Sequence, residues 1–494
     1  MRQNAPVVGR KLYLCSMTID ELIERIAGQV GHVPTADQAH ALQVFARFMF
    51  DRADASAMIL RGSAGTGKTT VASAMVRTLR QLGVKTVLLA PTGRAAKVFS
   101  LNSGQEASTI HRKIYRQKSL ESGFGLGFNA HRDTLFLVDE ASMIANDGRA
   151  ESVFGTGRLL DDLVSFVYGG QGCRLMLIGD RAQLPPVGEE ASPALEGSVM
   201  RGYGLHVYEA DLDEVVRQSQ ESGILWNATR IRNLTLNIRF TGFADVRRVT
   251  GDELIEQLAS SYSRVGVDET MVVTRSNKRA VVYNMGIRNT ILGREEELTS
   301  GDRLMVVKNK YLSARSSQSS RSAQSSPDSQ EQGLTFIANG DMAVVQRVRN
   351  IHEMHGFRFA DVWVQFPDYD GEEMQLRMLL DTLQTEAPAL TREQSAQLYN
   401  KVLEDYADVR PKTERLKRIK EDPYYTAMQV KYGYAVTCHK AQGGQWAHVY
   451  IDQGYITEDM LDRDYAHWLY TAFTRATEQV FLVNWKTLPP ASPL

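Results

Sequence analysis

The sequence has few cysteines, little net charge and no long apolar run. Its 494 residues include three cysteines, Cys15, Cys173 and Cys438, which stand far apart and form no C-x-x-C pair. This argues against a zinc site or a disulfide framework and favours a reducing, cytoplasmic compartment. No apolar stretch approaches the length of a membrane span. The apolar patch Leu12 to Leu14 is too short for a signal peptide.

Positive and negative charges nearly cancel. The chain carries 57 Lys and Arg against 58 Asp and Glu, a formal net charge of −1. A nucleic-acid surface on such a chain has to be local and balanced by acidic faces elsewhere. The length and the otherwise ordinary composition predict a globular protein of about two to four domains.

The most specific stretch is G-S-A-G-T-G-K-T at residues 62–69, which fits the P-loop pattern G-x-x-x-x-G-K-[ST]. A short apolar run precedes it, and apolar residues at helical spacing follow it. Lys68 is expected to neutralise β- and γ-phosphate oxygens, and Thr69 to ligate Mg²⁺. The residues expected to bind the nucleotide here are Gly62, Ser63, Ala64, Gly65, Thr66, Gly67, Lys68, Thr69 and Thr70.

Two later apolar runs also end in polar residues. Residues 135–138 lead into Asp139 and Glu140, which predicts that Asp139 holds Mg²⁺ through water and that Glu140 orients or deprotonates the attacking water. Residues 174–178 lead into a loop with Gln183, which is placed to sense the γ-phosphate. The chain is therefore predicted to bind and hydrolyse a nucleoside triphosphate.

Two further segments offer groups to a base or to phosphates. Thr35 is expected to cap a helix that carries Gln38, whose amide could pair with the N6 and N7 atoms of adenine. Spacing alone favours a solvent-facing Gln38 instead. After a buried strand at 86–90, Thr92 and Arg94 would offer donors to a phosphate chain, because ligands of open α/β sheets lie beyond the carboxyl ends of strands.

The C-terminal half has a different pattern. Residues 200–300 predict a second α/β unit without a P-loop, in which Ser276 is expected to cap a helix and which resumes from Tyr432. Between them lies a β-rich segment, predicted to be a small inserted barrel. Its Ser/Gln-rich part, 314–333, is predicted to be a disordered loop, and 371–421 a charged helical projection.

Taken in order, the motifs resemble those of superfamily 1 (group B) DNA helicases, most closely the RecD-like and phage Dda-like branch. The match covers nearly the whole chain. The matching segments are GSAGTGKT at 62–69, LAPTGRAAK at 89–97, EASTIH at 106–111, LVDEASM at 137–143, GDRAQLPPVG at 179–188, EVVRQ at 214–218, TCHKAQGGQW at 437–446 and YTAFTRA at 470–476.

The resemblance implies an α/β fold of two RecA-like P-loop domains with parallel sheets, ATP between them and single-stranded DNA across both. It also implies an inserted pin subdomain and an inserted SH3-like β-barrel. The implied domains are an arm at 1–33, a first domain at 34–198 with the pin at about 112–132, a second domain at 199–302 and 426–494, and the barrel insert with its projection at 303–425.

The resemblance also implies roles. Gln38 resembles the adenine-reading glutamine, which replaces the solvent-facing interpretation. Arg217 and Arg475 resemble two arginines that reach the γ-phosphate from the second domain, where they stabilise transition-state charge. Gly444 falls in the nucleotide-binding set, although Gln445 replaces the usual acidic neighbour, which weakens the case for a ribose contact. The positions resembling DNA contacts are Pro91, Thr92, His111, Thr437, His439 and Lys440; Phe124 and Phe128 fall where the branch carries its strand-separating pin.

The implied activity is that of an ATP- and Mg²⁺-dependent 5′→3′ DNA helicase in replication, repair or recombination. It would act as a monomer on single-stranded and forked duplex DNA, away from membranes, in the nucleoid of a bacterial or phage-infected cell. Single-strand-binding or replication proteins are the expected partners. Two alternatives remain: a DNA-dependent ATPase that displaces proteins without unwinding, and an oligomeric ATPase that supplies its arginine in trans.

Overall fold

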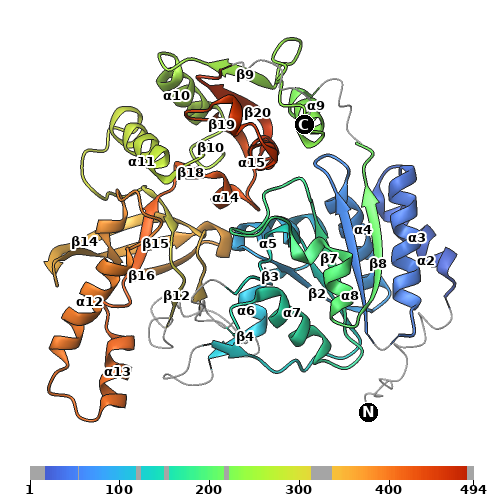
Figure 1. The fold of residues 1–494 in the computed structure, drawn as a ribbon, viewed down its shortest axis with the longest axis horizontal. Helices are drawn as coiled ribbons and strands as arrows, with labels where there is room; N and C mark the ends of the chain where they lie inside the picture. Colours follow the sequence, from blue (N-terminus) through green and yellow to red (C-terminus); the bar gives the residue numbers. More distant parts are fainter. Residues whose placement is uncertain are drawn as a thin grey trace, which may run out of the picture. The chain divides into compact units, whose positions relative to one another are not determined.

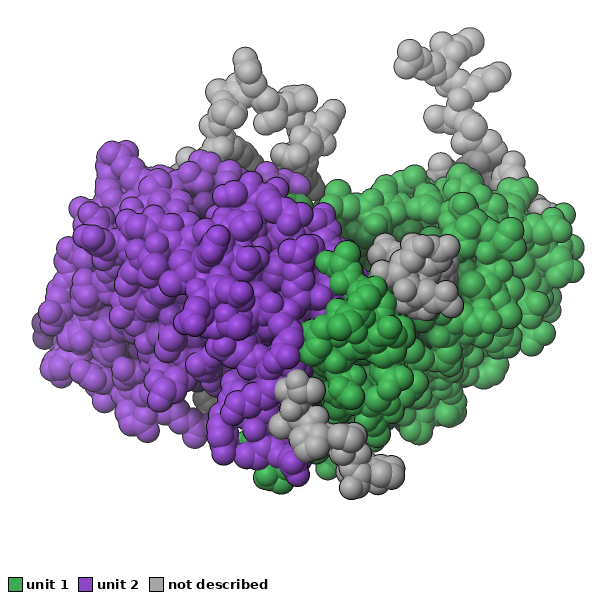
Figure 2. All heavy atoms as spheres, turned by 90° about the horizontal axis from the view of Figure 1, so that it is seen from above, with its two compact units in different colours: residues 1–244, 459–474, 489–494 green, residues 245–458, 475–488 purple. Residues whose placement is uncertain are grey.

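The computed structural model describes residues 17–53, 55–117, 124–148, 155–215, 222–312 and 336–486. The chain divides into two compact units (Figure 2). Unit 1 comprises residues 1–244, 459–474 and 489–494, and unit 2 comprises 245–458 and 475–488. Each unit is built on one parallel sheet, and unit 2 adds a closed β-barrel. The predicted α/β fold class with an inserted barrel is confirmed.

Unit 1 contains a six-stranded parallel sheet in the order β3-β2-β6-β7-β1-β8 (Figure 1). Its inner strands are buried along their length, as expected for a parallel sheet with covered faces. The strands are β1 Ser56–Gly62, β2 Lys85–Ala90, β3 Ala107–Thr109, β6 Thr134–Val138, β7 Arg174–Gly179 and β8 His206–Leu212. The helices are α2 Ile19–Val30, α3 Ala36–Phe50, α4 Lys68–Gln81, α5 Gly93–Ser103, α6 Ile110–Ile114, α7 Leu159–Tyr168, α8 Gly197–Gly202, α9 Gly223–Arg232 and α15 Arg463–Phe473. Short 3₁₀ turns lie at Ala141–Met143 and Pro193–Leu195.

Strand β8 changes the expected boundary between the domains. The sequence predicts residues 199–302 in the second α/β domain, yet β8 pairs in parallel with β1 along its whole length. Ala210 and Leu212 of β8 are buried in the unit 1 core. Helix α15, expected in the second domain, also belongs to unit 1. An apolar run predicts a strand but does not say which neighbour it pairs with.

Helix α2 is part of the core of unit 1 and not a peripheral arm. Thr18 caps it, and Glu21 completes the capping box. Leu22 and Ile26 are fully buried against α3 and α4. The rest of the predicted arm, residues 1–16, lies outside the described residues.

Unit 2 contains a five-stranded parallel sheet in the order β18-β10-β19-β20-β9. The strands are β9 Val246–Val249, β10 Thr270–Thr274, β18 Ala435–Thr437, β19 Trp446–Asp452 and β20 Ala476–Val483. The helices are α10 Leu254–Arg264, α11 Asn277–Gly286, the π-helix η4 Ile287–Ile291 and α14 Cys438–Ala441. Ser276 caps α11 as predicted, since its Oγ accepts from the Arg279 N–H at 3.2 Å. No helix within the described ranges is both long and apolar enough to cross a bilayer.

The barrel of unit 2 closes in the order β11-β14-β15-β16-β17. The strands are β11 Arg303–Val306, β14 Met342–Met354, β15 Phe357–Phe366, β16 Glu372–Leu379 and β17 Met428–Tyr432, with a small pair β12 Lys310–Tyr311 and β13 Phe336–Ile337 beside them. The barrel therefore extends past the predicted boundary at residue 425. Short 3₁₀ turns lie at Pro367–Tyr369 and Leu380–Thr382.

The helical projection is shorter than the predicted range 371–421. Residues 372–379 form strand β16, because Met374, Leu376 and Met378 are buried at the period of two that a strand requires. The helices are α12 Arg392–Asp405 and α13 Lys412–Glu421, which pack on Phe357 and Phe359 of β15. The predicted disordered loop at 314–333 lies outside the described residues.

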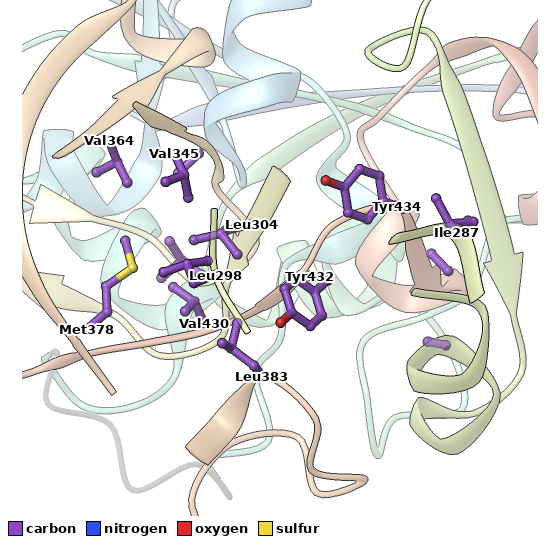
Figure 3. Close-up of a cluster of buried hydrophobic side chains, with 14 of the residues drawn as sticks. Ile287, Leu298, Leu304, Val345, Val364, Met378, Leu383, Val430, Tyr432 and Tyr434 are labelled. Carbon is purple, nitrogen blue, oxygen red and sulfur yellow. The ribbon is translucent and has the colours of Figure 1, made fainter. Parts of the chain in front are cut away.

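One hydrophobic cluster joins the barrel to the sheet of unit 2 (Figure 3). Leu304 and Val430 from the barrel share it with Ile287 from the π-helix. Beside it, Arg288 forms a fully buried ion pair with Asp302 at 2.9 Å. The barrel is thus held within unit 2 by shared core packing as well as by the chain.

Candidate nucleotide and DNA site

The P-loop connects β1 to α4 in unit 1. Gly65 and Gly67 have φ angles of 80° and 84°, a region that residues with a Cβ rarely adopt. A Cβ on Gly62 would come within 2.8 Å of Thr66 Oγ1 and 2.9 Å of Lys68 Cγ. Helix α4 begins at Lys68 without a side-chain cap. The first backbone N–H groups of α4 therefore receive no side-chain cap, which is the arrangement that phosphate binding at a helix N-terminus requires.

The side chain of Lys68 folds back onto the P-loop. Its Nζ donates to Ser63 O at 2.9 Å and lies 3.9 Å from Asp180 Oδ2. Asp180 directly follows β7 and is only 2% exposed. The ammonium group is thus held at the phosphate side of the loop by one carbonyl and one carboxylate.

The acidic pair follows β6, the neighbour of β7. The Glu140 N–H donates to Asp139 Oδ1 at 2.9 Å, and Glu140 has a φ of 51°. Burial raises the pKa of Asp139 to about 7, the Glu140 charge adds to this rise, and Lys68 opposes it. Two carboxylates crowded in this way favour a divalent cation. A carboxylate such as Asp139 and a hydroxyl such as that of Thr69 are the kinds of oxygen ligand that Mg²⁺ takes together with phosphates and water.

Gln183 lies on the loop after β7. It is 5% exposed, and its Oε1 makes no hydrogen bond within the part of the chain that the structure describes. Its N–H donates to Asp180 O at 3.3 Å. The loop is therefore a turn that holds a buried amide close to the aspartate beside Lys68.

Gln38 is fully buried, so the solvent-facing interpretation is wrong. Its Nε2 donates to Thr66 O in the P-loop at 3.0 Å. Its Oε1 accepts from Thr35 N at 3.3 Å and lies 3.2 Å from His32 Nε2. The structure therefore brings Gln38 to the P-loop, with its amide bonded to the loop backbone and to the cap of α3.

In unit 2, Arg475 and Gly444 lie together. Arg475 is 2% exposed, and its Nη1 donates to Gly444 O at 3.2 Å. A Cβ on Gly444 would come within 2.4 Å of the Trp446 ring, so this position requires glycine. Arg217, the second predicted arginine, lies outside the described residues.

The predicted DNA contacts of unit 1 follow two adjacent strands. Pro91, Thr92 and Arg94 follow β2, and His111 follows β3, which pairs in parallel with β2. Thr92 caps α5 by accepting from Ala95 N at 3.2 Å. Burial lowers the pKa of His111 to about 4, so the ring is neutral at pH 7. Because β2 and β3 are parallel neighbours, Thr92 and His111 both lie at the carboxyl end of these strands.

The predicted DNA contacts of unit 2 follow β18. Thr437 ends the strand, and His439 and Lys440 lie on α14. Lys440 Nζ is buried and finds no hydrogen-bond acceptor among the described groups. It borders a small pocket that is also lined by Asn277 and Lys431. Burial, reinforced by the Lys431 charge, lowers the pKa of Lys440 to about 8.

The predicted pin is a short antiparallel hairpin of β4 Tyr115–Gln117 and β5 Phe124–Leu126 (Figure 1). Residues 118–123 between these strands lie outside the described ranges. Phe128, just after β5, is 89% exposed. An aromatic ring this exposed contributes little to a core, which favours an interaction role.

Two residues at the P-loop were not predicted. The Tyr470 hydroxyl, on α15, accepts from Ala64 N at 2.7 Å and donates to Asp180 Oδ2 at 2.6 Å. Arg232, on α9, donates to the Ser63 hydroxyl and borders a cavity of about 430 Å³ beside the loop. Tyr470 lies in the YTAFTRA motif, where only the arginine was assigned a role. No sequence signal marks Arg232.

Comparison with known families gives two matches. An AAA domain family matches residues 34–239, and the UvrD-like helicase C-terminal domain matches residues 432–483. The first covers the P-loop, the acidic pair and Gln183; the second covers Thr437, Gly444 and Arg475.

Two relatives align with part of the chain. The ATP-dependent RecD2 DNA helicase of Deinococcus radiodurans is 35% identical over 136 residues, which is 26% of this chain and 16% of that protein. The ATP-dependent DNA helicase dda of Enterobacteria phage T4 is 26% identical over 268 residues, 50% of this chain and 55% of that protein. The chain thus spans about a sixth and about half of their lengths.

Among solved structures, a Pif1 helicase from Bacteroides in complex with ADP-AlF3 and single-stranded DNA is 16% identical, with a TM-score of 0.45. The alignment covers 93% of this chain and 94% of that one. The ordered motifs, the two family matches and the relatives together place the chain in superfamily 1, group B, of the helicases, in the RecD-like and Dda-like branch.

Proposed function

We propose that this chain is an ATP-dependent DNA helicase that moves 5′→3′ on single-stranded DNA and separates the duplex ahead of it. The observation that carries the proposal is the arrangement in unit 1: an uncapped P-loop helix, with Lys68 beside Asp180 and the pair Asp139–Glu140 following an adjacent strand. The polarity is supported by membership of the branch.

For ATP hydrolysis, the N–H groups of the P-loop bind the phosphates, and Lys68 exchanges the Ser63 carbonyl for phosphate oxygens. Thr69, and Asp139 through water, would hold Mg²⁺, which would supply positive charge to the β- and γ-phosphates. Glu140 orients the attacking water and accepts its proton. Arg475 and Arg217 supply the cations that stabilise the transition state.

For DNA, Thr92 and Arg94 bind phosphates from unit 1, and Thr437, His439 and Lys440 bind them from unit 2. Because His111 is neutral, it contacts DNA by hydrogen bonding or stacking rather than by charge. The hairpin β4–β5 with Phe128 separates the strands of a fork. The two sets of contacts bind and release the DNA alternately, and this moves the chain along one strand.

The biological setting that fits is replication, repair or recombination, with a monomer acting on single-stranded and forked DNA. Single-strand-binding or replication proteins are the partners expected there.

The decisive experiment measures unwinding of duplexes that carry either a 5′ or a 3′ single-stranded tail, with ATP and Mg²⁺. Wild-type chain is expected to unwind only the 5′-tailed substrate, and Lys68→Ala neither. Unwinding of the 3′-tailed substrate alone would overturn the polarity. DNA-stimulated ATP hydrolysis without any unwinding would favour the protein-displacing ATPase instead.

The hairpin is tested separately with the double variant Phe124→Ala/Phe128→Ala. We expect it to keep DNA-stimulated ATP hydrolysis and translocation and to lose unwinding of a fork. Full unwinding by this variant would remove the hairpin from the mechanism while leaving the ATP site untouched.

A further inference from the structure

Helix α15 is attached to the loop that follows β7 at three points. The Leu184 N–H donates to Thr471 Oγ1 at 2.8 Å, and His467 Nδ1 lies 2.9 Å from Ala182 O. The third point is the bond from Tyr470 to Asp180. This loop also carries Gln183, so any movement of α15 acts on the residue predicted to sense the γ-phosphate.

Tyr470 extends this attachment to the P-loop itself. Its hydroxyl bridges Ala64 N and Asp180 Oδ2, at 2.7 Å and 2.6 Å. The ring is 1% exposed. Burial raises the pKa of Tyr470 well above its usual value, so the phenol remains a donor to the aspartate at all ordinary pH values. The hydroxyl therefore satisfies a P-loop amide that lies in the phosphate cradle.

The position of this amide indicates which phosphate reaches it. The N–H groups of a P-loop cradle the α- and β-phosphates, and its lysine reaches beyond them to the γ-phosphate. The same Asp180 oxygen that accepts from Tyr470 lies 3.9 Å from Lys68 Nζ, the group that reaches the β- and γ-phosphates. The Tyr470 hydroxyl thus occupies the γ-phosphate side of the cradle.

We propose that Tyr470 is a positioning residue that couples the nucleotide to α15: the γ-phosphate displaces its hydroxyl from Ala64, and ADP does not. A phosphate oxygen is charged and makes a stronger hydrogen bond to an N–H than a neutral phenol does. The Tyr470 hydroxyl then no longer accepts from the Ala64 N–H, and α15 loses its direct hydrogen bond to the P-loop. The inference rests on the proposed ATP site. It goes beyond it by assigning the ATP-versus-ADP response to a residue outside the hydrolytic set.

The test compares nucleotide affinities of the full chain and Tyr470→Phe. Fluorescent ADP and a fluorescent non-hydrolysable ATP analogue are titrated with Mg²⁺. Tyr470→Phe is expected to raise the preference for the ATP analogue over ADP by about five- to tenfold, the effect of removing one competing hydrogen bond. Affinity for ADP should stay within about twofold of wild type.

A matched control is Tyr168→Phe in the same unit. Tyr168 donates to Ser56 O at 2.8 Å, so this variant also loses one tyrosine hydrogen bond, but away from the P-loop. Its preference for the ATP analogue should equal that of wild type. An unchanged preference in Tyr470→Phe would overturn the inference, as would weaker binding of the ATP analogue, because the hydroxyl would then be a phosphate ligand.

A second measurement needs no variant. Hydrogen exchange of the wild-type chain should show faster exchange in peptides covering 180–186 and 463–473 with the ATP analogue than with ADP. Equal exchange would overturn the inference. A wild-type chain that binds neither nucleotide would overturn the proposed function itself, whereas loss of the preference shift alone leaves that function standing.

Discussion

The two units carry the same kind of sheet, and within the described residues only unit 1 has the features expected to bind a nucleotide. In unit 1, β1 leads through two glycines of positive φ into α4, which starts without a side-chain cap. In unit 2, β10 leads into α11, where the Ser276 hydroxyl already accepts from the Arg279 N–H. A helix N-terminus without a side-chain cap can offer its first N–H groups to an anion, and a capped one has fewer to offer. The connecting loop, and not the parallel sheet, decides where the phosphate goes.

The largest expected effect comes from replacing Lys68, the first residue of α4. Lys68→Ala should lower the DNA-stimulated ATP hydrolysis rate by about a thousandfold or more, because a cation at the transferring phosphate is lost. The matched control is Lys278→Ala, in the first turn of α11, where the lysine side chain is 73% exposed. The control should hydrolyse ATP at the wild-type rate. Equal losses of ATP hydrolysis in the two variants would contradict the proposed difference between the two units.

A smaller effect is expected from the P-loop backbone. Gly67→Ala forces a residue with a Cβ into a φ of 84°, at a cost of about 1–2 kcal/mol. Nucleotide affinity, measured by titration calorimetry, should therefore fall by about five- to thirtyfold. Gly286→Ala, at the end of α11, is the control, since a Cβ there meets nothing within 4 Å. Unchanged affinity in Gly67→Ala would show that the loop conformation is not required.

The pH dependence tests the buried lysine of unit 2. Below its pKa of about 8, Lys440 is charged and, as a proposed DNA contact, would attract phosphate; above that pKa the lysine is neutral and the attraction would be lost. Affinity for single-stranded DNA should fall by about three- to tenfold between about pH 7 and about pH 9 in fluorescence anisotropy. Lys440→Arg keeps its charge over this range and should flatten the decline. The same decline in both proteins would exclude Lys440 as its cause.

The smallest effect concerns the cap that distinguishes α11 from α4. Ser276→Ala removes the acceptor for the Arg279 N–H and should lower the free energy of unfolding by about 1 kcal/mol, measured in urea. ATP hydrolysis should stay at the wild-type rate. A large loss of hydrolysis would mean that the start of α11 takes part in the ATP site after all.

Local patterns in the sequence predict the features that depend on neighbouring residues. The P-loop, the caps at Thr35 and Ser276, and the strand ahead of Asp139 all appear at their predicted positions. Each depends on spacing within one turn or one strand, where backbone chemistry allows few alternatives. The assigned roles of these residues in hydrolysis remain predictions.

Long-range partners account for what the sequence did not predict. A run of leucines and methionines at 374–380 fits a helix or a strand, and only closure of the barrel makes β16 a strand. Likewise, the residues around Gln38 do not predict that its side-chain amide donates to Thr66 O. These outcomes depend on which distant surface buries the segment.

The sequence by itself determined that the chain has one P-loop, an acidic pair and an ordered set of helicase motifs, because these are short patterns with a local physical cause. Only the tertiary structure decided that β8 and α15 complete unit 1 and that the Tyr470 hydroxyl lies on the P-loop. The separation in sequence between Tyr470 and Ala64 leaves no local trace of their contact. Burial against a distant partner is a property of the folded chain, and no single segment encodes it.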